Sequence, residues 1–366
     1  MARTVNRITC QRPGSSKQRT CDRRRTDSMN ESRGAVRVID VARAAGVSTA
    51  TVSNVINKPD RVGARTRRKV ERAIDDLGFV PNRAAQQLRI GVSSSVGLIV
   101  PDVSYPFFTD LARGAEAEAA ERGLSVFLGN SDINHGKEVG LVRSFLQQRV
   151  RGLLVAPITD PRAVLDIAEH AEVPFVLVDT PSLIDANVSS VASDGFAGGR
   201  IAVRHLRERG STRLAFIGWD GDPAQVLERW NGAQREAQET PGMALRRIPP
   251  EGRGLPAGVN IGRAILAMPP SERPDGLIAP NDALAVGVVN ALVAGAGTEV
   301  FRDIRVVGYD DLEIASNAVV PITSIRQSSE LIGRSAISLL EELVSTSEPV
   351  HRRIVYEPTL VVRSTT

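Results

Sequence analysis

Cysteine and histidine are scarce in this sequence, which limits the chemistry that the protein can perform. Its 366 residues include 2 cysteines and 4 histidines. Cys10 and Cys21 lie in an arginine-rich leader without metal-ligand spacing, so we predict neither a disulfide framework nor a zinc site. The sequence has no Ser-His-Asp, metal-ligand or phosphate-loop pattern, and its histidines are His135, His170, His205 and His351. We therefore predict that the protein is not an enzyme and uses no cofactor or metal.

Long apolar runs are also missing. No stretch approaches the ~18 consecutive apolar residues that a membrane-spanning helix needs. The arginine-rich start lacks the apolar segment of a secretory signal. Together with the scarcity of cysteine, these features predict a cytoplasmic protein that has no membrane partner.

Positive charge is concentrated at one end of the chain. Residues 1–35 carry 9 basic and 3 acidic side chains, residues 36–92 carry 11 and 5, and residues 93–366 carry 26 and 34. The corresponding net charges of +6, +6 and −8 make up the overall +4. A basic head on an acidic body is expected when the head alone contacts phosphates.

The segment RVIDVARAAGVSTATVSNVIN, which begins at Arg37, has the pattern of two short helices. Val38, Val41, Ala42 and Ala45 recur at helical spacing and predict a first helix with one apolar face. Gly46 follows where a helix end favours a left-handed residue.

In the second of these helices, Ser48 can act as the N-cap and Val52, Val55 and Ile56 face inward. Its outer face carries small residues, namely Thr49, Ala50, Ser53 and Asn54. Two helices joined by a short glycine-containing turn predict a helix-turn-helix whose second helix enters the major groove of DNA.

A third helix is predicted in RTRRKVERAIDDLG, where Val70, Ile74 and Leu77 complete a small core. Pro81 then breaks the chain, and Asn82 can cap a further short helix that ends near Leu88. From its residues alone, Leu88 has two interpretations. It is either a linker residue that packs on the next domain or a wedge that unstacks a base step in the minor groove.

IDVARAAGVSTATVSNVIN, RTRRKVERAIDDLGFVPN and NRAAQQLR resemble the head and hinge of the LacI/GalR (lactose/galactose repressor) family of bacterial transcriptional regulators. The resemblance continues more loosely to the C-terminus. It implies a helix-turn-helix domain at 36–80, a hinge helix and linker at 81–95, and the wedge role for Leu88. The residues expected to contact DNA are Ser48, Thr49, Ala50, Thr51, Ser53, Asn54, Asn57, Arg65, Asn82, Arg83, Ala85 and Leu88.

Asn54 departs from the family pattern, because relatives often carry Arg or His at this base-reading position. An asparagine can pair with the N6 and N7 atoms of adenine, a contact that discriminates against the wrong base by ~1–3 kcal/mol. The alternative is that Asn54 contacts only phosphate.

The leader at 1–35 is rich in Arg, Ser and Thr and has almost no aliphatic pattern, which predicts disorder. A start at Met29 would place Ile39 about where chains of the family usually have it. The leader is therefore either a mis-called start or a genuine basic arm that adds phosphate contacts.

From Val96 onward, continuous apolar runs alternate with amphipathic helical segments, for example VGLIVP, RGLLVAP and FVLVDT. This alternation predicts parallel sheets covered on both faces, and its restart near Gly198 predicts two α/β lobes with a ligand cleft between them. The resemblance implies that this α/β effector-binding and dimerisation domain at 96–366 is periplasmic-binding-protein-like. It places about 96–191 and 325–349 in the first lobe, and about 192–322 and 350–366 in the second.

Candidate cleft residues in the first lobe follow predicted strands. Phe107 and Phe108 line the effector pocket by resemblance, and their alternative is a hydrophobic staple at a helix start. Asp179 ends a strand, where it either faces the ligand or makes a turn. Asp194 either accepts hydrogen bonds from a ligand or caps the next helix.

In the second lobe, Arg229 and Gly232 match the family's R-x-x-G pattern, which places an effector-contacting arginine. An arginine can donate to two hydroxyls or to a carboxylate. Asn281 is expected to be an N-cap, an effector contact or both. Asp310 is expected to accept hydrogen bonds from ligand hydroxyls, with Asp311 as its solvated neighbour. Gln225 and the pair at 261–262 depart from the sugar-sensing pattern and leave the effector open.

With these features, the resemblance implies a homodimeric, sequence-specific DNA-binding regulator of transcription, a repressor associated with the nucleoid. It would bind a near-palindromic double-stranded operator and respond to a small-molecule effector, a sugar or a related metabolite. One alternative is a co-repressor-dependent regulator of the purine type. The others are a solute-binding protein, which would need a signal peptide and no DNA-binding head, and an enzyme that uses cleft carboxylates.

Overall fold

The computed structural model describes residues 36–80, 93–180, 188–346 and 350–366. The chain divides into two compact units, Met1–Gln86 and Gln87–Thr366. The predicted leader and hinge helix, with Asn82, Arg83, Ala85 and Leu88, lie outside the described residues. None of the helices within the described ranges is long and apolar enough to cross a membrane.

The first unit is a small helical domain, as predicted. Its elements are α1 (Val38–Ala45), α2 (Thr49–Asn57), the 3-10 turn η1 (Pro59–Arg61) and α3 (Ala64–Leu77). Gly46 ends α1 at a φ of 60°, a left-handed conformation that a glycine adopts without strain. The expectation for Leu77 is wrong, because its side chain is 37% exposed. Phe79 packs into the core in its place, since Gly78 turns the chain back at the end of α3.

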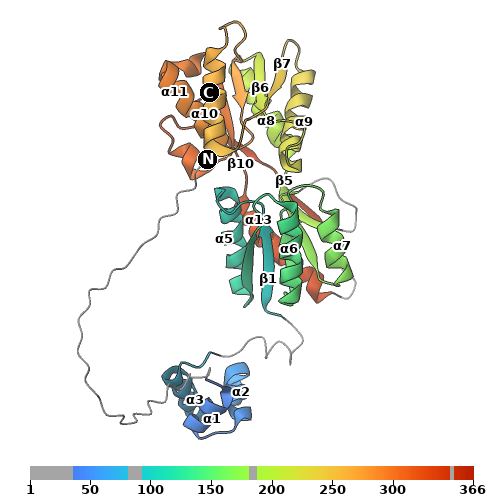
Figure 1. Cartoon of the computed structure of the whole chain (residues 1–366), viewed down its shortest axis with the longest axis vertical. Coiled ribbons are helices and arrows are strands. Elements are labelled where there is room, and N and C mark those ends of the chain that lie inside the picture. The colour runs from blue at the N-terminus through green and yellow to red at the C-terminus, as the bar shows by residue number, and fades with distance from the viewer. Residues whose placement is uncertain (1–35, 81–92, 181–187, 347–349) are drawn as a thin grey trace, which may run out of the picture. The chain divides into compact units, whose positions relative to one another are not determined.

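The second unit contains two α/β lobes, each with its own sheet (Figure 1). In the first lobe, the strand order β11-β5-β4-β3-β1-β2 is parallel throughout. Helices α5 and α13 cover one face of this sheet, and α6 and α7 cover the other. The elements of this lobe are β1 (Ser95–Val100), α5 (Pro106–Glu121), β2 (Ser125–Asn130), α6 (His135–Gln147), β3 (Gly152–Val155), α7 (Arg162–His170), β4 (Phe175–Val178), β5 (Ser189–Ser193), α13 (Ser329–Ser345) and β11 (Arg353–Tyr356).

The second lobe repeats this arrangement, with strand order β12-β10-β9-β8-β6-β7. Its strands are parallel except that β12 runs antiparallel to β10. Helices α8 and α9 cover one face, and α10 and α11 cover the other. Its elements are α8 (Gly195–Glu208), β6 (Arg213–Ile217), α9 (Ala224–Glu239), β7 (Ala244–Ile248), α10 (Gly254–Ala267), β8 (Gly276–Ile278), α11 (Asp282–Ala296), η2 (Thr298–Arg302), β9 (Arg305–Asp310), α12 (Glu313–Ser316), β10 (Thr323–Arg326) and β12 (Thr359–Val361).

The chain passes between the lobes after β5, after β10 and after β11. In Figure 1, α13 accordingly lies among the elements of the first lobe although it is late in the sequence. One expected boundary needs correction. Strand β11 lies beside β5 in the first lobe, so residues 350–366 are shared between the lobes. Strand β10 pairs with β9, so the return to the first lobe, expected near residue 325, begins after Arg326.

Helices α5 and α13 cross at a pair of glycines. A Cβ atom on Gly114 would overlap the carbonyl oxygen of Glu330, and one on Gly333 would overlap that of Leu111. Each glycine therefore lets the backbone of the other helix approach closely. The same reciprocal arrangement joins α8 to α9 at Gly199 and Gly232. These close contacts set the position of α5 against α13 in the first lobe and of α8 against α9 in the second.

Candidate functional site

Helix α2 of the first unit presents a small outward surface. Val52 and Val55 are buried against the neighbouring helices, whereas Thr49, Ala50 and Asn54 are exposed. The spacing of four residues between Ala50 and Asn54 places them one above the other on the same helix face. This outward surface has the form that a base-reading helix needs.

Most other polar side chains of α2 are engaged within the helix. The hydroxyl of Ser48 accepts a hydrogen bond from the amide of Thr51 at 3.1 Å and lies 2.9 Å from its hydroxyl. The side-chain amide of Asn57 donates to the carbonyl and the hydroxyl of Ser53, at 2.8 and 3.2 Å. Arg65, also expected at the DNA, is exposed in the first turn of α3. Contact of any of these residues with DNA stays a prediction.

Asp310 is the centre of a polar cluster between the lobes of the second unit. It is the last residue of β9 and is almost fully buried. Its carboxylate accepts hydrogen bonds from the hydroxyl of Tyr105, in the first lobe, and from the side-chain amide of Gln327 at 2.5 Å. Burial raises the pKa of Asp310 from its ordinary value, although the charge of Arg229 opposes this rise.

Arg229 projects from α9 toward the same carboxylate, with 3.7 Å between its Nη2 atom and Asp310 Oδ1. Its Nη1 donates to the carbonyl of Pro280, and its guanidinium lies 3.8 Å from the centroid of the Tyr309 ring. Among the described residues, the Nε atom of Arg229 and the Oε1 atom of Gln225 are buried without a hydrogen-bond partner. Gln225 lies one helical turn before Arg229, so α9 carries an unused donor and an unused acceptor on one face.

Asp179, just after β4, is a further ionisable residue near Arg229 and Asp310. It is 5% exposed and has a φ of 56°. Burial raises the pKa of Asp179 to about 7, against the opposing charge of Arg229. Its carboxylate makes no hydrogen bond or ion pair within the described part of the chain, so it remains available to a ligand.

Four other predicted site residues have structural roles. Asp194 caps α8 by accepting from the amide of Ala197 at 2.8 Å. Asn281 caps α11 by accepting from the amide of Leu284 at 3.0 Å. Phe107 and Phe108 are 2% and 7% exposed and belong to the core of the first lobe. Effector contact by these four residues stays a prediction.

Two stretches of the chain match known protein families. Residues 38–82 match the bacterial regulatory proteins of the lacI family, and residues 203–366 match the periplasmic binding protein-like domain. The chain is also 31% identical over 331 residues to the HTH-type transcriptional repressor PurR of Vibrio atlanticus (strain LGP32). This alignment covers 89% of this chain and 97% of the relative. The chain belongs to the lacI family of bacterial regulatory proteins.

Further similarities extend over nearly the whole protein. The ribose operon repressor of Escherichia coli (strain K12) is 32% identical over 331 residues, which cover 88% of this chain and 98% of the relative. The crystal structure of the lac repressor dimer bound to operator and the anti-inducer ONPF has a TM-score of 0.77 at 27% identity. It covers 91% of this chain and 99% of that chain. This lacI-family protein is thus a DNA-binding transcriptional regulator with an effector domain, and a solute-binding protein is not favoured.

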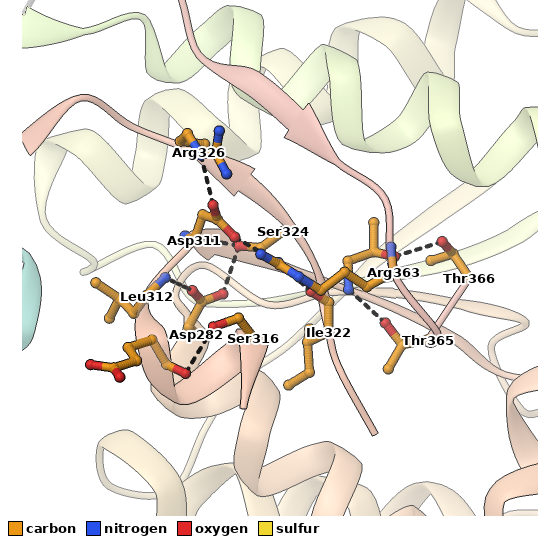
Figure 2. A network of polar contacts seen from close by, with 12 residues as sticks. Asp282, Asp311, Leu312, Ser316, Ile322, Ser324, Arg326, Arg363, Thr365 and Thr366 are labelled. Carbon is orange, nitrogen blue, oxygen red and sulfur yellow. Dashed lines mark hydrogen bonds and ion pairs between the residues drawn. The ribbon is translucent and has the colours of Figure 1, made fainter. Parts of the chain in front are cut away.

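The expectation of a solvated Asp311 is wrong for this lacI-family regulator. Its side chain is 5% exposed and accepts from Arg326 Nε at 2.7 Å and from Arg363 Nη1 at 2.6 Å. Figure 2 shows these arginines approaching Asp311 from different segments of the chain. The φ angles of 100° at Asp310 and 58° at Asp311 turn the two carboxylates to different partners. Through these ion pairs, Asp311 links β10 and the segment after β12 to the end of β9.

A second buried carboxylate supports this turn. Asp282 accepts from the hydroxyl of Ser324 and from the amide of Leu312, both at 2.7 Å (Figure 2). Burial raises the pKa of Asp282 to about 8. Sequence reasoning missed Asp282, Tyr105 and Gln327 as neighbours of Asp310. The strand-end rule gave a signal for Tyr105, which lies in the same segment as Phe107, but Gln327 follows β10, a strand that the apolar pattern does not reveal.

Proposed function

We propose that this lacI-family regulator is a repressor that binds a near-palindromic operator as a homodimer, with each α2 helix at one half-site. The basic first unit, the exposed face of α2 and the sequence similarity to named repressors support this proposal. The neighbouring structure of a lac repressor dimer on its operator supports the assembly. Such a protein acts on chromosomal DNA in the cytoplasm, and we assign it no catalytic role.

The effector that we propose is a neutral polyhydroxylated compound of the sugar type. The observation that carries this assignment is the buried pair of Arg229 and Asp310, which Tyr105 links to the other lobe. A hydroxyl both donates and accepts, so adjacent hydroxyls of a ligand can accept from the guanidinium and donate to the carboxylate. The unpaired Nε of Arg229 and Oε1 of Gln225 add one further donor and acceptor.

The charges around this pair argue against an anionic effector. The guanidinium of Arg229 already faces the carboxylate of Asp310 at 3.7 Å, and the buried carboxyl group of Asp179 nearby brings no positive charge. A phosphate or a second carboxylate would be repelled, and a buried charge without a partner is costly. A neutral ligand meets no such penalty.

Thermal unfolding in the presence of matched ligands tests this proposal. We would compare D-ribose and D-glucose with ribose 5-phosphate, gluconate and hypoxanthine. A ligand at about 100 times its dissociation constant adds about 2.7 kcal/mol to the unfolding free energy. We expect stabilisation by a neutral sugar and none by its phosphorylated or acidic counterpart. Stabilisation by the anions alone would overturn the assignment of a neutral effector, and stabilisation by hypoxanthine would favour the purine-type alternative.

Variants on α9 give the matched control for this measurement. Arg229→Lys keeps a positive charge but lacks the forked donors, so we expect it to lose most of the ligand-induced shift. Arg235→Ala removes an exposed arginine of the same helix that pairs with Glu239 at 2.8 Å, and the shift should be unchanged. Equal loss of the shift in both variants would contradict a specific role for Arg229.

Operator binding is tested with the DNA that flanks the protein's own coding region. We expect specific binding whose affinity falls steeply with salt, because the basic head releases counterions from the phosphates. Adding the ligand found by thermal unfolding then gives the sign of the response. Weaker binding identifies an inducer, and tighter binding identifies a co-repressor. The absence of any specific binding with or without that ligand would overturn the proposed function.

A further inference from the structure

The outward face of α2 has unusual chemistry for a helix that reads DNA. Its sequence, TATVSNVIN, contains neither arginine nor lysine. The commonest side-chain contact to guanine uses the paired donors of Arg or Lys on its O6 and N7 atoms. Helix α2 cannot make this contact, so its base contacts depend on small polar and methyl groups.

The hydrogen bonds within α2 narrow the choice of base-reading residues. Ser48 and Thr51 bond to each other at the start of the helix, and Asn57 bonds to Ser53 near its end. Within the part of the chain that the structure describes, the exposed side-chain amide of Asn54 makes no hydrogen bond. Both its NH2 donor and its oxygen acceptor are therefore available. Thr49 and Ala50 beside it are exposed as well.

The short side chain of Ala50 permits a second contact of α2 with a base. An alanine lets the helix backbone approach the base edges, and its methyl group can contact the C5-methyl group of thymine. Ala50 and Asn54 lie one helical turn apart, with about 5–6 Å between their Cβ atoms. Adjacent base pairs rise by about 3.4 Å along the duplex. The two residues therefore reach base pairs that are neighbours or one step apart.

We propose that α2 selects A·T base pairs in the operator half-site, with the Asn54 amide on an adenine and the Ala50 methyl on a nearby thymine. This inference rests on the proposed function as a DNA-binding regulator. It goes beyond that function because it names the base class that this chain recognises and the residues that impose it.

The first experiment is selection of bound sequences from a randomised duplex library with the full-length protein at low salt. We expect the enriched half-site to contain an adenine column that Asn54→Ala flattens, with a loss of discrimination between about fivefold and about 150-fold. Asn54→Arg should convert the same column to guanine, because it restores the paired donors for O6 and N7. The other columns of the same selection serve as internal controls, and Asn317→Ala in the second unit should leave every column unchanged.

The second experiment tests the methyl contact with 2′-deoxyuridine, which lacks the C5-methyl group of thymidine. Each thymidine of the selected half-site is replaced in turn, and binding is measured for the unmodified protein and for Ala50→Gly. We expect one replacement to weaken binding by the unmodified protein about fourfold, the equivalent of one buried methyl group. The same replacement should have no effect on Ala50→Gly, whatever that variant's own affinity is.

The outcomes separate this inference from the function on which it rests. If a half-site is enriched but Asn54→Ala leaves all of its columns unchanged, the adenine contact is wrong and the DNA-binding function stands. If deoxyuridine weakens both proteins equally or neither of them, the methyl contact is wrong. If no sequence is enriched with or without the ligands tested above, the proposed sequence-specific function fails and the inference fails with it.

Discussion

The hydroxyl of Tyr105 donates a hydrogen bond to the carboxylate of Asp310, and this bond joins the two lobes of the second unit. Tyr105 stands directly before α5 in the first lobe, whereas Asp310 ends β9 in the second. Its burial and the nearby charge of Asp310 raise the pKa of Tyr105 well above its ordinary value, so the phenol keeps its proton and remains a donor. Asp310 thus contacts the first lobe through the same carboxylate that we propose for a ligand hydroxyl, so such a hydroxyl would have to share the carboxylate with the phenol or displace it.

We expect Tyr105→Phe to lower the free energy of unfolding by about 1.5–3 kcal/mol, the range for a hydrogen bond to a charged group. Because the phenol competes for Asp310, the variant should also bind the effector more tightly. Denaturant unfolding and ligand titration measure the two effects. Tyr356→Phe is the matched control, since Tyr356 bonds to Ser335 within the first lobe at 2.7 Å and should leave ligand affinity unchanged. Equal effects of both variants on ligand affinity would contradict the competition.

Asp311→Asn should destabilise the protein more than the loss of an ordinary surface ion pair. Its carboxylate is buried between Arg326 and Arg363, and Arg363 is itself only 18% exposed, so the variant leaves a buried guanidinium without its counter-charge. Breaking a buried pair from one side costs about 3–5 kcal/mol. Because Arg326 is 54% exposed, its ion pair with Asp311 contributes little. We therefore expect a loss near the lower end of this range, at about 3 kcal/mol.

Glu299→Gln is the control for this variant. Glu299 pairs with Arg302 at 2.9 Å, but both side chains are more than 70% exposed, so its loss should cost less than about 1 kcal/mol. Urea unfolding curves of the two variants measure the difference. Similar losses for both would show that Asp311 is no more than a surface partner of its arginines.

The sequence predicted the layered fold well where strands are buried on both faces. β1, β3 and β4 are continuous apolar runs, as parallel strands between helices require. β5 escaped notice because its sequence, SSVAS, buries small hydroxyl residues that do not form an apolar run. β7 lies at the edge of its sheet and carries Arg246 and Arg247, so it lacks such a run too.

The lobe to which a strand belongs was not predictable from local pattern. The run at 353–361 looks like one strand, yet β11 and β12 join different sheets on either side of Glu357 and Pro358. Similarly, strand-end positions indicated Asp179 and Asp310, and the family pattern indicated Arg229. Neither showed that Tyr105 and Gln327 reach Asp310 from other parts of the chain. Contacts between distant segments depend on how the chain passes between the lobes. These passages leave no periodic pattern in a single sequence.

Gly114→Ala should destabilise the first lobe, because the added methyl group would overlap the backbone of α13 at Glu330. Extra volume at a packed contact costs about 1–3 kcal/mol. Gly140→Ala offers the opposite case, since Gly140 is exposed within α6 and a methyl group added there would meet nothing within 4 Å. At this position alanine should stabilise the protein by about 0.5–1 kcal/mol. Thermal unfolding of both variants tests the close crossing, and stabilisation by both would contradict it.

The stability of the protein should fall as pH rises toward neutrality, and Asp179 should cause part of this fall. Its pKa is about 7 in the folded chain against an ordinary value of 3.8. Between these values the folded chain holds a proton that the unfolded chain has released, so a rise in pH favours unfolding. The contribution is complete below about pH 4 and is lost as pH passes through about 7. Its upper bound is about 4 kcal/mol, at about 1.4 kcal/mol for each pKa unit.

Asp179→Asn, which is neutral at every pH, should remove this dependence. We expect the variant to match the unmodified protein near pH 4 and to exceed its unfolding free energy near pH 8, as measured by urea unfolding across this range. Glu118→Gln is a control of opposite sign. Hydrogen bonds from Arg122 and Ser338 lower the pKa of Glu118, so this variant should lose stability at neutral pH and approach the unmodified protein in acid. If Asp179→Asn instead gains most in acid, the carboxylate of Asp179 is ionised in the folded protein and its pKa is not raised.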